Sequence, residues 1–134
     1  MSPHTQPHFD RYLHNIGLAQ RIETNLPDKD WVSVALFYSA LHLMTAYLVN
    51  KQNVSLDPAS SVHTSRWQAM MKCPELAAPR ERYRALKDLS ESVRYDPGFI
   101  FGPADLTDAK DHFNRCIAVV LPKVQKMMAP PKKS

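Results

Sequence analysis

Five side chains in this 134-residue sequence have the types and spacing that anion binding or proton transfer requires: His42, His63, Arg66, Arg94 and Tyr95. A histidine titrates near neutral pH and can act as a general base. An arginine presents a planar fork of N–H donors that matches a pair of phosphate oxygens. Together these residues favour a site that recognises an anion.

His63 and Arg66 are three residues apart at the start of a predicted short helix, so both point to one side of it. Ser60 or Ser61 precedes them, at the end of the helix whose free N–H groups attract an anion. This arrangement indicates a phosphate site. The alternative is an ordinary solvated helix start.

Arg94 closes a polar ridge on a predicted long helix, with members spaced four, three and four apart: Tyr83, Lys87, Ser90 and Arg94. We expect this ridge to lie opposite the apolar positions of the same helix, which are Leu86, Leu89 and Val93. A strong helix breaker, Asp96-Pro97-Gly98, follows directly. Arg94 either caps the last carbonyl groups of its helix or binds a phosphate at the mouth of a cleft.

His42 lies in the most apolar segment of the chain, between Tyr38 and Ala46 on one helical stripe. One interpretation is a neutral core histidine whose ring is satisfied by a hydrogen bond. The other is a histidine that forms the wall of a site and serves as its general base.

Apolar residues recur at helical spacing in five segments, near residues 8–24, 28–50, 60–72, 79–95 and from 105 onward. Prolines punctuate the boundaries, and no alternating strand pattern is present. The sequence therefore predicts an all-α antiparallel helix bundle with four long helices and one short helix. We expect a flexible arm at residues 1–7, a helical domain at 8–127 and a disordered tail at 128–134.

The composition predicts a cytoplasmic protein without cofactor or metal. Cys73 and Cys116 stand alone and read as buried reduced thiols, and no metal-ligand spacing or nucleotide motif occurs. The first residues lack the apolar run of a signal peptide. Polar residues interrupt the apolar stretch from Val32 to Val49, which favours a core helix over a membrane span. The net charge of +4 is compatible with a nucleic-acid partner.

Three segments resemble HEPN domains, over roughly residues 8–126. They are Asp30-Trp31 followed by ALFYSALHLMTAYL, then His63-Thr64-Ser65-Arg66, then the run from Tyr83 to Tyr95. The resemblance implies an α-helical bundle that dimerises. It also implies a metal-independent endoribonuclease of toxin–antitoxin or phage-defence systems, with an antitoxin or nucleotidyltransferase as a possible protein partner.

The chain departs from the family at its catalytic signature, an arginine followed four to six residues later by a histidine. Arg94 matches the arginine, but no histidine follows it at that distance. Arg94 is therefore carried over as a binding residue only.

Three functions remain open at this point. The first is a dimeric HEPN-like module that binds RNA or a nucleotide phosphate through His63, Arg66, Arg94 and Tyr95. The second is a metal-independent endoribonuclease in which His63 or His42 replaces the missing histidine. The third is a non-catalytic scaffold that binds another protein.

Overall fold

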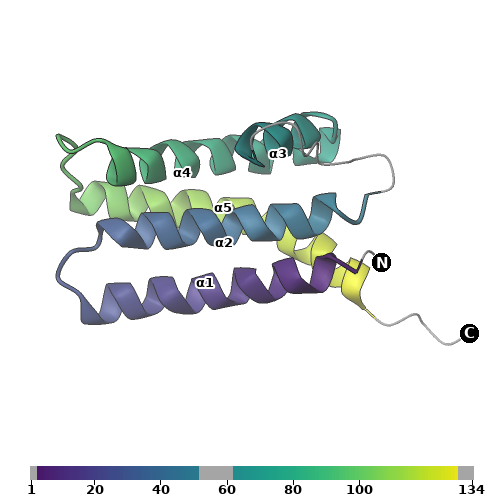
Figure 1. The fold of residues 1–134 in the computed structure, drawn as a ribbon, viewed down its shortest axis with the longest axis horizontal. Helices are drawn as coiled ribbons and strands as arrows, with labels where there is room; N and C mark the ends of the chain where they lie inside the picture. The colour runs from purple at the N-terminus through teal and green to yellow at the C-terminus, as the bar shows by residue number, and fades with distance from the viewer. Residues whose placement is uncertain (1–2, 52–61, 130–134) are drawn as a thin grey trace, which may run out of the picture.

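A computed structural model describes residues 3–51 and 62–129, with the backbone alone for residues 62–65 (Figure 1). The described residues form five α-helices, one short 3-10 helix and no strand. These elements are α1 (Thr5–Asn25), α2 (Asp30–Leu48), α3 (Val62–Met71), η1 (Pro74–Leu76), α4 (Ala77–Tyr95) and α5 (Pro103–Met128). The predicted all-α bundle of four long helices and one short helix is confirmed.

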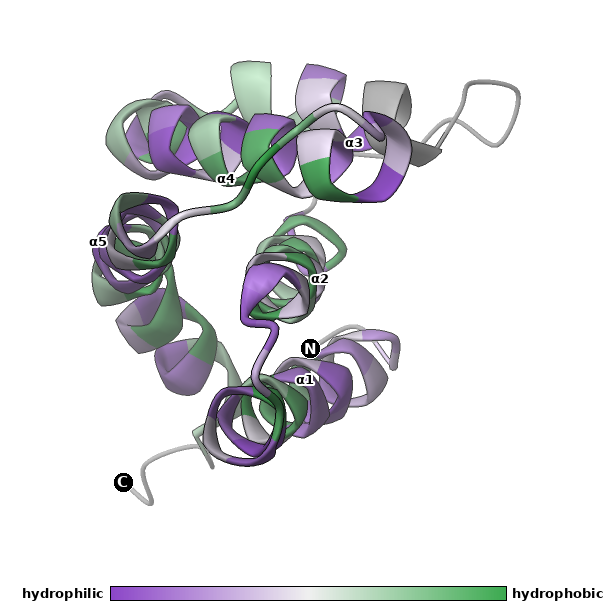
Figure 2. Ribbon diagram, turned by 90° about the vertical axis from the view of Figure 1, so that its left-hand side faces the viewer, coloured by the Kyte–Doolittle hydropathy of each residue, from purple (hydrophilic) through white to green (hydrophobic). Residues whose placement is uncertain are grey.

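The bundle consists of two helical hairpins with α2 at the centre. α1 and α2 run antiparallel, as do α4 and α5, and α3 lies beside the first turns of α4 (Figure 1). Viewed end-on, α2 lies between α1 and the pair formed by α4 and α5 (Figure 2). The central helix can therefore present different faces to different neighbours.

α2 is central because it is apolar on almost every side. Fifteen of its residues are buried, including Phe37, Leu43 and Met44, which have no exposed surface. By length and composition α2 could cross a membrane, yet 83% of its apolar window is buried inside the bundle. This burial accounts for the apolar character of α2, as expected for a core helix.

The first helix begins earlier than predicted, at Thr5 rather than near residue 8. Thr5 is fully buried, and its hydroxyl lies 3.5 Å from the carbonyl oxygen of Ala46 on α2. Pro7 is tolerated because the first four N–H groups of a helix have no partner within the helix. Residues 5–7 of the predicted arm are therefore helical, whereas residues 130–134 of the predicted tail lie outside the described residues.

The helical spacing of Phe9, Leu13 and Ile16 predicts that these three residues share the buried face of α1, but the structure buries a neighbouring face. Tyr12 and Ala19 pack into the core, and Phe9 and Ile16 lie at its edge. Leu13, which was predicted to be buried, is exposed. The outward position of Leu13 leaves an apolar side chain on the surface of α1.

The predicted polar ridge on α4 does not lie opposite the apolar face of the helix, so that prediction is wrong. Tyr83 and Ser90 are buried together with Leu86, whereas Leu89 and Val93 are only half-buried. α4 packs against both α2 and α5, so its most buried positions lie between these two neighbours. A tyrosine ring and a small serine fit there despite their hydroxyl groups.

α5 keeps its predicted apolar stripe and continues through Pro122 to Met128. Its course changes toward the C-terminal end (Figure 2), as expected for a helix that contains a proline in its interior. Cys73 and Cys116 are buried free thiols, as predicted. Burial raises the pKa of Cys116 to about 12.

Candidate anion-binding site

One face of α2 carries the polar residues around which the candidate site is built. Tyr38, His42 and Thr45 are spaced four and three apart, so they lie in a row along the helix. We call these three residues the α2 stripe. Each of them contacts a polar side chain from a different helix.

Arg94 of α4 contacts the first member of the stripe. Its Nη1 donates a hydrogen bond to the Tyr38 hydroxyl at 2.6 Å, and its Nε donates to the carbonyl oxygen of Ser90 at 3.2 Å. The guanidinium also lies over the rings of Phe37, Tyr38 and Tyr95, at 5.6, 5.2 and 4.9 Å from their centroids. Arg94 therefore binds a carbonyl of its own helix and also contacts the rings of Tyr38 in the stripe and Tyr95 next to it.

His8 of α1 contacts the second member of the stripe. The Nδ1 atoms of His8 and His42 are 3.0 Å apart, and their rings stack with centroids 5.2 Å apart. Burial, followed by the charges of His8, Arg66 and Arg11, lowers the pKa of His42 to about 4. Burial and then Arg66 and His4 lower the pKa of His8 as well. Both rings are therefore uncharged at neutral pH, with one nitrogen donating and the other accepting.

Arg66 of α3 contacts the third member of the stripe. Its Nε donates to the Thr45 hydroxyl oxygen at 2.7 Å. Its Nη1 is buried and has no hydrogen-bond partner within the described part of the chain, and the same holds for the Tyr83 hydroxyl. Burial lowers the pKa of Arg66, which nevertheless stays charged at neutral pH. An unpaired buried N–H is costly, so Arg66 retains a strong donor for an acceptor oxygen.

A groove of about 390 Å³ runs between α1 and α2 and includes two members of the stripe. It is mainly apolar, with a few polar groups, as is typical of ligand or partner sites. Arg11 supplies its positive charge and is exposed to solvent. The groove is lined by Arg11, Asn15, Leu18, Ile22, Trp31, Val34, Ala35, Tyr38 and His42.

The three arginines of this region have no acidic partner among residues 3–51 and 66–129. The ion pairs of those residues all lie elsewhere and join Lys51 to Glu75, Arg82 and Arg115 to Asp111, Lys87 to Glu91, and Lys110 to Glu23. Arg11, Arg66 and Arg94 thus give the α2 stripe a positive charge that no described carboxylate neutralises. Such a region attracts anions.

The structure brings Arg66 and Arg94 to the α2 stripe, which contains His42. The two arginines contact the stripe at different positions along the helix. Tyr38 and Thr45 are seven positions apart in the sequence, which corresponds to roughly 10 Å along a helix. The start of α3 does not meet the end of α4, because α3 lies beside the first turns of α4 (Figure 1). The predicted single pocket shared by Arg66 and Arg94 is therefore wrong. The side chain of His63 lies outside the described residues.

Sequence reasoning missed His8 and Arg11, which come from α1. The distance from His8 to His42 along the chain is 34 residues, and no sequence motif links them. Their meeting depends on the register between the two antiparallel helices. A histidine on the predicted first helix was the only available signal.

No group of three or more His, Cys, Asp or Glu side chains suited to a metal ion occurs among the described residues. Comparison of the chain with protein-family models, with curated proteins and with solved structures finds no match. The geometry of the site is therefore the basis for a functional proposal.

Proposed function

We propose that this chain is a HEPN-like helical module of the cytoplasm that forms a homodimer and binds RNA or a nucleotide phosphate. The observation that carries this proposal is that three arginines lie along the α2 stripe and the groove beside it, and that none of them has a described acidic partner. Arginine forks suit phosphate oxygens, and exposed aromatic rings suit nucleobases.

Aromatic side chains beside the arginines support a nucleotide rather than a simple anion. Tyr95 is 73% exposed and holds its ring 4.9 Å from the Arg94 guanidinium. Trp31 is exposed at one end of the groove. A base stacked on the Tyr95 ring would leave its phosphate within reach of Arg94.

The α1–α2 face supports the homodimer. Leu18 and Trp31 are exposed apolar side chains on this face, and both line the groove. Contiguous exposed apolar surface marks interaction sites. Light scattering at micromolar concentration should give a dimer mass that Leu18→Glu lowers to a monomer mass, with Met71→Glu on α3 as the control. A monomer mass of the wild type across a dilution series would remove the dimer.

The second candidate function is a metal-independent endoribonuclease, and the pair of uncharged histidines favours it. His42 or His63 would act as the general base in place of the missing histidine. A pKa of about 4 makes His42 a weak base, because an effective catalytic base titrates near the working pH. Binding is therefore the function that the geometry supports better.

The test is binding of a mixed pool of single-stranded RNA, with chelator present, over a series of salt concentrations. We expect Arg11→Ala and Arg94→Ala to weaken binding. Each lost phosphate contact should reduce the slope of log affinity against log salt by about 0.7. Arg115→Ala on α5 removes the same charge far along the sequence from the stripe and is the matched control.

Each outcome of this experiment separates two of the functions. Equal weakening by Arg115→Ala would show that only the net charge matters. Unchanged binding in Arg11→Ala and Arg94→Ala, with intact circular dichroism, would leave the protein-binding scaffold. Cleavage in chelator that disappears in His42→Ala or His63→Ala would establish the ribonuclease instead.

A further inference from the structure

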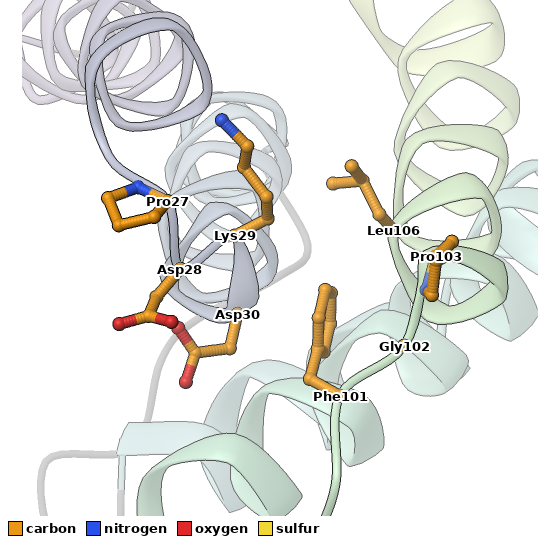
Figure 3. Close-up of a pocket in the computed structure, with 8 residues that line it drawn as sticks. All are labelled: Pro27, Asp28, Lys29, Asp30, Phe101, Gly102, Pro103 and Leu106. Atoms are coloured by element: carbon orange, nitrogen blue, oxygen red, sulfur yellow. The ribbon is translucent and has the colours of Figure 1, made fainter.

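Two connections meet at the end of the bundle opposite to the chain termini. The α1–α2 turn and the segment between α4 and α5 lie at the left in Figure 1. Between them is a cavity of about 450 Å³, which we call the pole pocket (Figure 3). It is lined by Pro27, Asp28, Lys29, Asp30, Phe101, Gly102, Pro103 and Leu106.

This end of the bundle gathers exposed apolar side chains. Of the seven large apolar residues exposed in the described part of the chain, two lie within these connections: Leu26 and Ile100. Ile100 is the extreme case at 88% exposed, directly before Phe101 of the pocket wall. Exposed apolar side chains in the segments that form a cavity are typical of a protein interaction site.

The charge of the pole pocket is negative, in contrast to the whole chain. The carboxylates of Asp28 and Asp30 point to the same side in Figure 3, away from Leu106 and Pro103 on the opposite wall. The Lys29 ammonium points away from them and donates a hydrogen bond to the carbonyl oxygen of Glu23. Asp105 adds a third carboxylate next to the pocket, where it accepts the N–H of Gly102.

We propose that the pole pocket docks a segment of a partner protein that presents a lysine or arginine beside an apolar side chain. The apolar side chain would enter between Phe101 and Leu106 and pack against Ile100. The basic side chain would face the two carboxylates, where complementary charge fixes the orientation of the segment. Nucleic acid does not suit this surface, because its phosphates would meet Asp28 and Asp30. The proposal does not depend on RNA binding at the α2 stripe.

The experiment is selection of a random-peptide phage library against the full chain. We expect the enriched peptides to carry Lys or Arg next to an apolar residue. In fluorescence anisotropy, one synthesised peptide should bind the Ile100→Ser protein roughly tenfold more weakly than the wild type. Loss of a central apolar contact typically weakens binding by this much. The Asp28→Asn/Asp30→Asn protein should bind it about fivefold more weakly, because rim charges contribute less.

The controls are Met71→Ser and Asp88→Asn, which change an exposed apolar side chain and an exposed carboxylate on other parts of the surface. Neither should alter peptide binding. Three outcomes would overturn the proposal. They are no enrichment over the empty vector, enriched peptides without basic residues, and affinity unchanged in both pocket variants. Self-association of the chain that Ile100→Ser abolishes would identify a second copy as the occupant and also reject the partner segment.

Discussion

The α2 stripe lies along the central helix and the pole pocket lies at the first residue of that helix, and the two regions differ in charge and in how their polar groups are bound. The stripe has positive side chains around it, is at least half-buried, and is tied to three other helices by side-chain contacts. The pole pocket is negative, and its polar groups bind mainly backbone atoms nearby. The net charge of +4 thus describes neither region, and binding has to be argued from local charge.

The two regions should also differ in what they contribute to stability. Stripe residues cross from helix to helix, so their loss opens contacts within the fold. Ile100, next to Phe101 of the pole pocket, is exposed to solvent, so its loss removes little buried area. Four variants, ordered from the largest expected effect to the smallest, test this contrast.

Phe37→Ala should produce the largest loss, because Phe37 underlies the stripe and is fully buried. Its ring packs against Tyr83 and lies beneath the Arg94 guanidinium. We expect the free energy of unfolding to fall by about 2 to 5 kcal/mol, which urea denaturation measures. A loss below about 0.5 kcal/mol, the size of a surface effect, would show that the core is misplaced.

Thr45→Val should lower the free energy of unfolding by about 1 to 3 kcal/mol, because the variant leaves a buried donor of Arg66 without its acceptor. Thr107→Val is the matched control, since both hydroxyls also donate to the carbonyl four residues earlier. Thr107 is exposed and binds no other side chain among the described residues. Equal losses in the two variants would mean that the arginine contact contributes nothing.

Acidification should lower the free energy of unfolding through His42 of the stripe. The pKa of His42 is lowered from 6.5 to about 4 in the folded chain, so the unfolded chain binds the proton more readily. This contribution to stability is complete above the unfolded pKa and is lost as the pH falls toward about 4. The loss should be about 1 to 2 kcal/mol, because a half-buried ring keeps some contact with water.

Urea denaturation over this pH range measures the effect. His42→Gln should flatten the pH profile, whereas His14→Gln, at an exposed position on α1, should leave it as in the wild type. A wild-type slope that persists in His42→Gln would assign the pH dependence to other groups.

Ile100→Ser should have the smallest effect, within about 0.5 kcal/mol of the wild-type free energy of unfolding. Its side chain is 88% exposed and therefore buries little area in the isolated chain. Urea denaturation beside Phe37→Ala makes the comparison direct. A loss above about 2 kcal/mol would place Ile100 in the core and end the contrast between the two regions.

The sequence by itself determined the helices and their class. Proline positions and apolar spacing of about 3.6 residues are local properties, so they predicted the five helices and the central place of α2. The helix starts were less well predicted. Thr5 joins α1 because it contacts Ala46 of α2, which lies 41 residues further along the chain.

The candidate site was predicted only in part. Arg66 and Arg94 were found because arginines at the ends of predicted helices are visible in the sequence. His8 and Arg11 were missed, because only the register of α1 against α2 brings them to His42 and the groove.

The tertiary structure alone decided which face of each helix is buried and which side chains meet. Helical spacing shows that Tyr83, Ser90 and Arg94 share one side of α4, but it does not show what that side faces. Packing against α2 and α5 turned Tyr83 and Ser90 inward and left Arg94 at the edge, against Tyr38. The physical reason is that helix formation depends on neighbours along the chain, whereas a site between helices depends on how those helices pack.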